Sequence, residues 1–157
     1  MITCHPERSE GPGRTGGFLA TLGMTLVLAA CASSRPNDLT AIRALLDNQV
    51  AAWNRGDLEG YMAGYWKSPD LEFFSGSTIT RGWQPTLERY RSRYQSGGHE
   101  MGTLTFSELK IDVAGPNAAI ASGRWALRMK DGSPNGLFTV MLRRLPEGWR
   151  IVHDHSS

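Results

Sequence analysis

The second half of the chain consists of four strand-sized segments joined by short turns, and this pattern limits the folds open to it. Apolar and polar residues alternate with a period of two in each segment. The segments are residues 103–113, 118–129, 137–145 and 149–155. Their connections are rich in glycine and proline, which favour turns. Three short connections in succession predict a meander, and therefore an antiparallel sheet.

The first half has the spacing of helices instead. Apolar residues recur every three or four positions in residues 38–54, 58–65 and 85–96, and Asp57 is suited to cap the second of these segments. Residues 71–80 have the pattern of a short hairpin. Helices followed by an antiparallel sheet predict an α+β domain in which the helices cover one face of the sheet.

The N-terminal segment differs in character from the rest. An apolar run at residues 17–30 follows Arg8 and Arg14 and is too short to span a membrane comfortably, but it suits a signal peptide. Its end, Leu28-Ala29-Ala30-Cys31, resembles a bacterial lipobox. The resemblance implies that Cys31 is lipid-modified and anchors the chain in the bacterial envelope, at the periplasmic face of the outer membrane rather than in the cytoplasm. A buried N-terminal helix with a chance cysteine is the alternative.

These features divide the chain into three parts. We expect a signal peptide at 1–30, a flexible tether at 31–37 and one globular domain at 38–157. Cys31 would be the only cysteine left after cleavage, which excludes a disulfide framework or a cysteine-based zinc site. The formal net charge of +2 is too small for a nucleic-acid-binding surface, so no nucleic-acid partner is expected.

Several motifs in the domain resemble the SnoaL-like members of the nuclear transport factor 2-like superfamily. The corner Trp53-Asn54-Arg55-Gly56-Asp57 is similar to that family's turn between its first two helices. Gly123-Arg124-Trp125 and the final stretch 148–156 are similar to its last strands. The resemblance implies a cone-like, curved antiparallel sheet wrapped around three helices, with a pocket at the open end. It also implies a homodimer formed through the outer face of the sheet.

Arg124 is the first candidate for ligand contact. It lies on a strand of small and apolar residues. The end of the chain also resembles the association domain of calmodulin-dependent kinases, and this resemblance implies an arginine that lines the pocket at the matching position. A guanidinium there would bind the carboxylate or phosphate of an anionic ligand. The alternatives are an internal salt bridge to Asp154 or Asp70, or an exposed position on the outer face.

The last strand carries the other polar candidates. Strict alternation groups His153 and His155 with Trp149 and Ile151 on one face, and Asp154 with Ser156 on the other, so that only one set can line a cavity. Asp154, His155 and Tyr65 are the candidate acid–base residues of an enzyme. The two histidines lack a third ligand partner in sequence, so no metal site and no cofactor are expected.

Aromatic residues complete the predicted pocket. The predicted ligand-binding residues are Tyr61, Tyr65, Trp83, Tyr90, Arg124 and Asp154. The favoured function is an envelope-anchored domain that binds a small molecule, with Arg124 as the partner of an anionic group. An isomerase, cyclase or dehydratase and a non-catalytic dimerisation module are the alternatives, because one fold of this kind serves many functions.

Overall fold

A computed structural model describes residues 36–97 and 101–157, which together form one α+β domain. The predicted signal peptide, Cys31 and most of the predicted tether lie outside the described residues. The helices are α1 Pro36–Asn54, α2 Leu58–Met62 and α3 Trp83–Tyr94. The strands are β1 Glu72–Ser75, β2 Thr78–Arg81, β3 Thr103–Val113, β4 Ala118–Arg128, β5 Asn135–Leu145 and β6 Gly148–Ser156.

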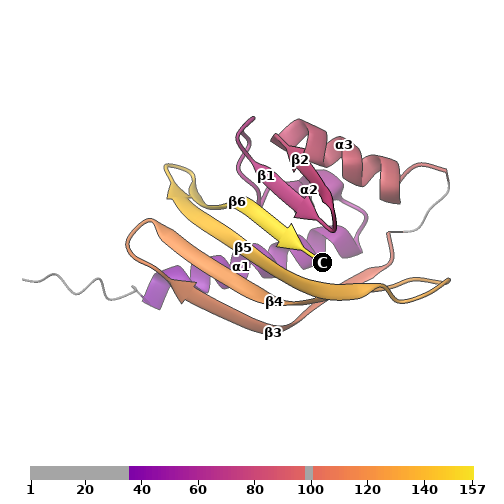
Figure 1. Ribbon diagram of the computed structural model, residues 1–157. Coiled ribbons are helices and arrows are strands. Elements are labelled where there is room, and N and C mark those ends of the chain that lie inside the picture. The colour runs from indigo at the N-terminus through magenta and orange to yellow at the C-terminus, as the bar shows by residue number, and fades with distance from the viewer. Residues whose placement is uncertain (1–35, 98–100) are drawn as a thin grey trace, which may run out of the picture. The chain divides into compact units, whose positions relative to one another are not determined.

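The strands form a single six-stranded sheet in the order β2-β1-β6-β5-β4-β3 (Figure 1). The meander β3–β6 is antiparallel throughout, as the turn spacing predicted. The short hairpin β1–β2 extends the sheet, and β1 runs parallel to β6. This parallel pairing has no short-range sequence signal, because the two strands are far apart in the chain.

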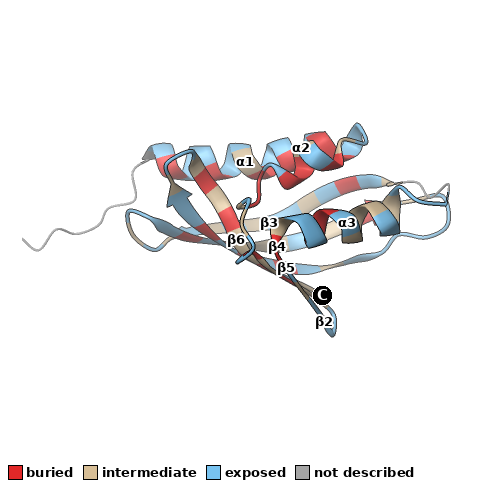
Figure 2. Ribbon diagram, turned by 90° about the horizontal axis from the view of Figure 1, so that it is seen from above, coloured by how far each residue is buried: buried red, intermediate tan, exposed pale blue. Residues whose placement is uncertain are grey.

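The curved sheet holds the three helices on one face, so that the domain has an inner and an outer sheet surface (Figure 2). The core lies between the helices and the inner surface of the sheet. Its largest fully buried side chains include Ile42 and Leu46 from α1, Leu87 from α3, and Leu142 and Ile151 from the sheet. The described part of the chain has no helix that is both long and apolar enough to cross a membrane.

The corner between α1 and α2 owes its sequence to specific contacts. Gly56 adopts a positive φ of 79°, which ends α1, and the Asp57 carboxylate caps α2 by accepting from the Gly60 amide at 2.7 Å. The Trp53 indole donates to the Met101 carbonyl at 3.0 Å. Asn54 makes two hydrogen bonds with the backbone of Leu104, at 2.7 and 3.0 Å. The motif therefore fastens α1 to β3, and its role is structural.

A β-bulge in β6 decides which side chains of that strand face inward. Ile151 is opposite Leu142 and His153 is opposite Met141, which leaves Val152 as an extra residue. The alternation is reset at this point. Trp149 and Ile151 before the bulge, and Asp154 after it, are therefore all buried on the inner face.

Candidate functional site

The candidate site is a cavity of about 110 Å³ between the helices and the inner face of the sheet. Its wall is largely aromatic, with contributions from α1, α2, α3 and the strands. The aromatic lining residues are Trp53, Tyr61, Tyr65, Phe73, Tyr90, Tyr94, Phe106, Trp125 and Phe138.

The rings are held by edge-to-face contacts with one another. The Trp53 ring packs against Tyr61 and Tyr94 with centroid separations of 5.1 and 4.9 Å, and Tyr61 packs against Tyr90 at 5.4 Å. Trp53, Tyr61 and Tyr90 each contact at least three other rings, so this part of the wall is shaped before any ligand enters.

One carboxyl group, that of Asp154, lies in this wall. The residue is 4% exposed. Its Oδ2 accepts a hydrogen bond from the Tyr65 hydroxyl at 2.6 Å, and its Oδ1 accepts one from the Ser156 hydroxyl at 2.8 Å. The Tyr65 hydroxyl in turn lies 3.4 Å from that of Tyr61. A carboxyl oxygen has room for a second hydrogen bond, so Asp154 can still accept one from a ligand.

Burial controls the protonation of this chain of groups. It raises the pKa of Asp154, although the hydrogen bonds from Tyr65 and Ser156 act in the opposite direction. Burial also raises the pKa of Tyr61 to about 12 and that of Tyr65 well above its usual value. The tyrosines are thus neutral hydrogen-bond donors. The site can donate hydrogen bonds from these hydroxyl groups. It also contains a carboxyl group whose pKa is raised, and a carboxyl of this kind can transfer a proton.

Four predicted residues come together in the cavity. Tyr61, Tyr65, Tyr90 and Asp154 all line it. These four side chains therefore lie in the cavity, and their role in ligand binding stays a prediction.

Arg124 does not line the cavity, which corrects its predicted position. It lies on the outer face, and its Nε is 3.4 Å from Glu108 Oε1 in an exposed ion pair. Alternation along β4 correctly separates Arg124 from Trp125, but Trp125 is the one that faces inward. Ala121 and Leu127 share the Trp125 face and are buried, whereas Ile120 shares the Arg124 face and is exposed, so the burial of the first set gives the orientation of the strand.

Trp83 and His155 also lie outside the cavity. The Trp83 indole donates to the Met62 carbonyl at 2.9 Å, which fixes the start of α3 against α2. His155 is exposed on the outer face, with its ring 6.1 Å from that of Phe74. The bulge at Val152 explains why Asp154 lies inside together with Ile151, a combination that strict alternation forbids.

His153 likewise lies on the outer face and contacts Glu72, with Nδ1 and Oε2 3.3 Å apart. Across residues 36–97 and 101–157, no group of three histidine, cysteine or acidic side chains is arranged to hold a metal ion.

Arg89 and Arg93 also line the cavity, although they are not among the ligand-binding residues that the sequence pattern predicted. Trp125 and Phe106 were missed as well. A helical-wheel comparison of Arg89 and Arg93 with the intervening Arg91 would separate the two faces, because positions four apart share a face.

Comparisons with known proteins agree with this architecture. The sequence matches the SnoaL-like domain family over residues 42–157. This chain belongs to the SnoaL-like family. A comparison with curated proteins gives no match.

Solved structures place the SnoaL-like domain in the nuclear transport factor 2-like fold. A protein of unknown function from Shewanella oneidensis, described as NTF-2 like, is 37% identical, with a TM-score of 0.72 over 76% of this chain and 98% of that one. A superfamily protein from Salmonella enterica is 23% identical, with a TM-score of 0.64 over 76% and 91%. A Nostoc punctiforme protein with a cystatin-like fold is 13% identical, with a TM-score of 0.64 over 78% and 91%. The predicted family and fold are confirmed.

Proposed function

We propose that this SnoaL-like domain binds a small molecule in its aromatic cavity. The observation that carries the proposal is a cavity that joins an aromatic wall to one buried carboxyl, Asp154. An apolar ring or short chain would contact the aromatic side chains, and a hydroxyl, amine or amide of the ligand would donate to Asp154. Binding sites commonly combine a mostly apolar surface with a few convergent polar groups in this way.

A thermal-shift measurement with small single-ring compounds tests the proposal. A ligand that binds only the folded state raises the melting temperature. We expect compounds that carry a hydrogen-bond donor, such as phenylacetamide, to do so. The variant Ser75→Trp, which places a large ring at a half-buried lining position, should abolish the shift.

Ile79→Trp is the matched control, because Ile79 is 48% exposed on the outer face of the same hairpin. Its ligand-induced shift should equal that of the wild type. The proposal fails if no compound stabilises the wild type more than Ser75→Trp.

An enzyme that moves a proton is the second candidate. The short 2.6 Å contact between Tyr65 and Asp154, in a cavity that raises the carboxyl pKa, supports it. Asp154 would take a proton from a carbon next to a carbonyl, which leaves the carboxyl group neutral and the negative charge on the enolate that forms. We expect the wild type to accelerate deuterium exchange into a cyclic 1,3-diketone in D₂O, as measured by NMR. Asp154→Asn, which keeps the shape of the side chain, should reduce the exchange to the uncatalysed rate; equal exchange by both proteins would exclude this role.

Anchoring in the bacterial envelope is proposed from the lipobox-like sequence that ends in Cys31. Expression of the full chain in bacteria fed a labelled fatty acid tests it. Label should enter the wild type and be absent from Cys31→Ser, and label in neither protein would refute lipidation.

A homodimer through the outer sheet face is proposed from exposed apolar side chains there. Ile120 and Met141 are 42% and 48% exposed and lie opposite each other on β4 and β5. Exposed apolar side chains that neighbour one another mark interaction surfaces. Met141→Asp should convert a dimer into a monomer in analytical ultracentrifugation, and a wild type that is monomeric at high concentration would refute the dimer.

A further inference from the structure

Two arginines of α3 face the cavity and have no carboxylate partner among the described residues. Arg89 and Arg93 are one helical turn apart and both line the cavity. Arg89 is half-buried and Arg93 is exposed, so they stand at the side where the cavity meets solvent. Like charges at this spacing destabilise an isolated helix, and a pair of this kind therefore calls for an explanation.

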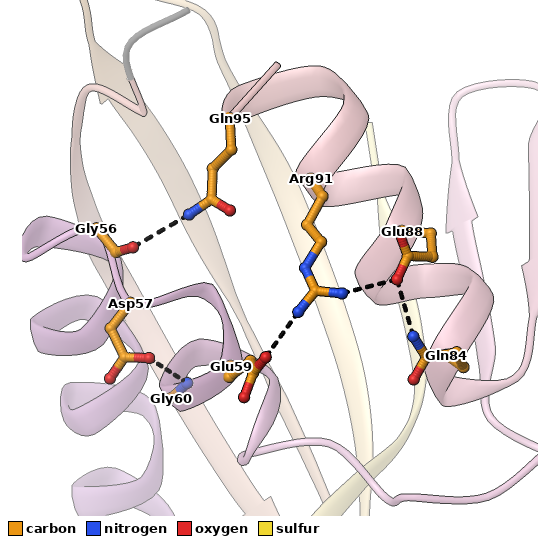
Figure 3. A network of polar contacts seen from close by, with 8 residues as sticks. All are labelled: Gly56, Asp57, Glu59, Gly60, Gln84, Glu88, Arg91 and Gln95. Carbon is orange, nitrogen blue, oxygen red and sulfur yellow. Dashed lines mark hydrogen bonds and ion pairs between the residues drawn. The ribbon is translucent and has the colours of Figure 1, made fainter.

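The neighbouring arginine is fully paired, which makes the contrast clear. Arg91 lies between α3 and α2, with Nη2 2.6 Å from Glu59 and Nη1 2.7 Å from Glu88 (Figure 3). It uses the carboxylates of both helices. The part of the chain that the structure describes offers no ion pair to Arg89 or Arg93.

The contacts of Arg89 and Arg93 are with aromatic rings instead. The Arg89 guanidinium is 5.8 Å from the Phe73 ring centre, and that of Arg93 is 5.5 Å from the Tyr94 ring centre. Both rings belong to the cavity wall. These cation–π contacts hold each guanidinium beside the cavity, and within the described residues no hydrogen bond occupies its N–H donors.

Asp154 does not fill this role. It is the one acidic residue among the described lining residues, and its oxygens are held by Tyr65 and Ser156. It forms no ion pair with either arginine within the described residues. The cavity thus has a carboxyl at one place and two guanidinium groups with free donors at another.

We propose that Arg89 and Arg93 bind the anionic group of the ligand, so that the ligand class is a small aromatic or apolar oxyanion, a carboxylate or a phosphate. The proposal rests on the function proposed above and names its ligand chemistry. Guanidinium groups match the planar geometry of these oxyanions and bind them through two parallel hydrogen bonds. A cavity of about 110 Å³ has room for one ring, whose anionic substituent would extend to the arginines.

Isothermal titration with three ligands of similar shape tests this proposal. Phenylacetamide is the neutral ligand, and phenylacetate and phenyl phosphate are the two anions. We expect at least one anion to bind the wild type about tenfold more tightly than the amide, because hydrogen bonds to charged groups are stronger. The anion that binds more tightly shows whether the anionic group of the ligand is a carboxylate or a phosphate.

The double variant Arg89→Gln/Arg93→Gln should lose this preference and keep its affinity for the amide. Arg91→Gln is the control on the same helix, since Arg91 is ion-paired outside the cavity, and it should keep the preference. Should the double variant not fold, the single variant Arg93→Gln replaces it, because this side chain is exposed. This variant removes one of the two positive charges, so its anion preference should fall by about threefold or more.

The outcomes separate the two proposals. Equal binding of amide and anions by the wild type, or a preference that survives in Arg89→Gln/Arg93→Gln, overturns the anion site and leaves the cavity as a binding site for neutral ligands. Absence of binding by all three probes overturns the proposed ligand-binding function itself.

Discussion

The two faces of β6 differ in chemistry although they come from the same nine residues. On the inner face, Trp149, Ile151 and Asp154 are each less than 5% exposed, and Asp154 belongs to a hydrogen-bonded chain of hydroxyl groups. On the outer face, His153 contacts the partly exposed Glu72, and His155 is exposed. Polar groups of similar kind are thus held in two different environments.

The difference shows that position relative to the bulge, and not residue type, separates candidate site residues from surface residues. The ionisable side chain on the inner face has its pKa shifted by burial and lies in a cavity. The histidines are separated from it by the thickness of the sheet. A general acid or base must reach the ligand, so only Asp154 of this run qualifies by geometry.

Truncation of an apolar side chain on the inner face should have the largest effect on the free energy of unfolding. Ile151 is 1% exposed and lies in the core next to the cavity, so Ile151→Ala should lower the free energy of unfolding by about 2–5 kcal/mol. Met141→Ala, on the outer face opposite His153, should change it by less than about 0.5 kcal/mol. Urea denaturation at several protein concentrations measures both and separates folding from association. Similar losses for the two variants would contradict the assignment of the faces.

Removal of the Tyr65 hydroxyl should have the next largest effect on the free energy of unfolding. Tyr65→Phe leaves the buried Oδ2 of Asp154 without its donor, which should cost about 1–3 kcal/mol of unfolding free energy. His153→Gln removes a partly exposed contact with Glu72 and should cost less than about 0.5 kcal/mol. The same denaturation experiment compares them, and a larger loss in His153→Gln would show that the outer contact is the more important one.

The pH dependence of stability should also distinguish the inner face. The pKa of Asp154 is raised in the folded state above its usual 3.8, chiefly by burial. Below pH 3.8 both states are protonated; above it the unfolded state releases its proton first, so stability falls as pH rises through the raised pKa. Wild type should therefore lose stability relative to Asp154→Asn across this window, as measured by thermal unfolding at stepped pH. A stability difference that stays constant, or that moves in favour of the wild type as pH rises, would contradict the buried carboxyl.

Much of the fold could be predicted because local patterns determine it. Period-two alternation and short turns gave the meander, and the corner at Trp53-Asn54 gave the family. The tyrosines of the cavity were predictable because they lie on helix faces that must pack on the sheet. The parallel pairing of β1 with β6 was not, since it depends on a contact between distant segments.

Three features of the site depend on tertiary packing and could not be predicted. The bulge at Val152 arises from the register of β6 on β5, and a single sequence does not contain that register. Alternation shows which residues of β4 share a face but does not show which face is inner, and this is why Arg124 was assigned to the wrong side. Arg89 and Arg93 were absent from the predicted ligand-binding residues for a similar reason, because the docking of α3 determines which arginines reach the cavity.

Arg124→Ala should leave ligand binding unchanged, and it completes the comparison of the two faces. The substitution removes an exposed ion pair with Glu108, for which a loss of at most about 1 kcal/mol is expected. Because the side chain lies on the opposite side of the sheet from the cavity, the affinity for phenylacetate should equal that of the wild type in a calorimetric titration. Arg93→Gln, tested in parallel, should weaken the same binding. If Arg124→Ala weakened phenylacetate binding as much as Arg93→Gln, the anion would have to be bound on the outer face, and the assignment of the ligand to the cavity would be wrong.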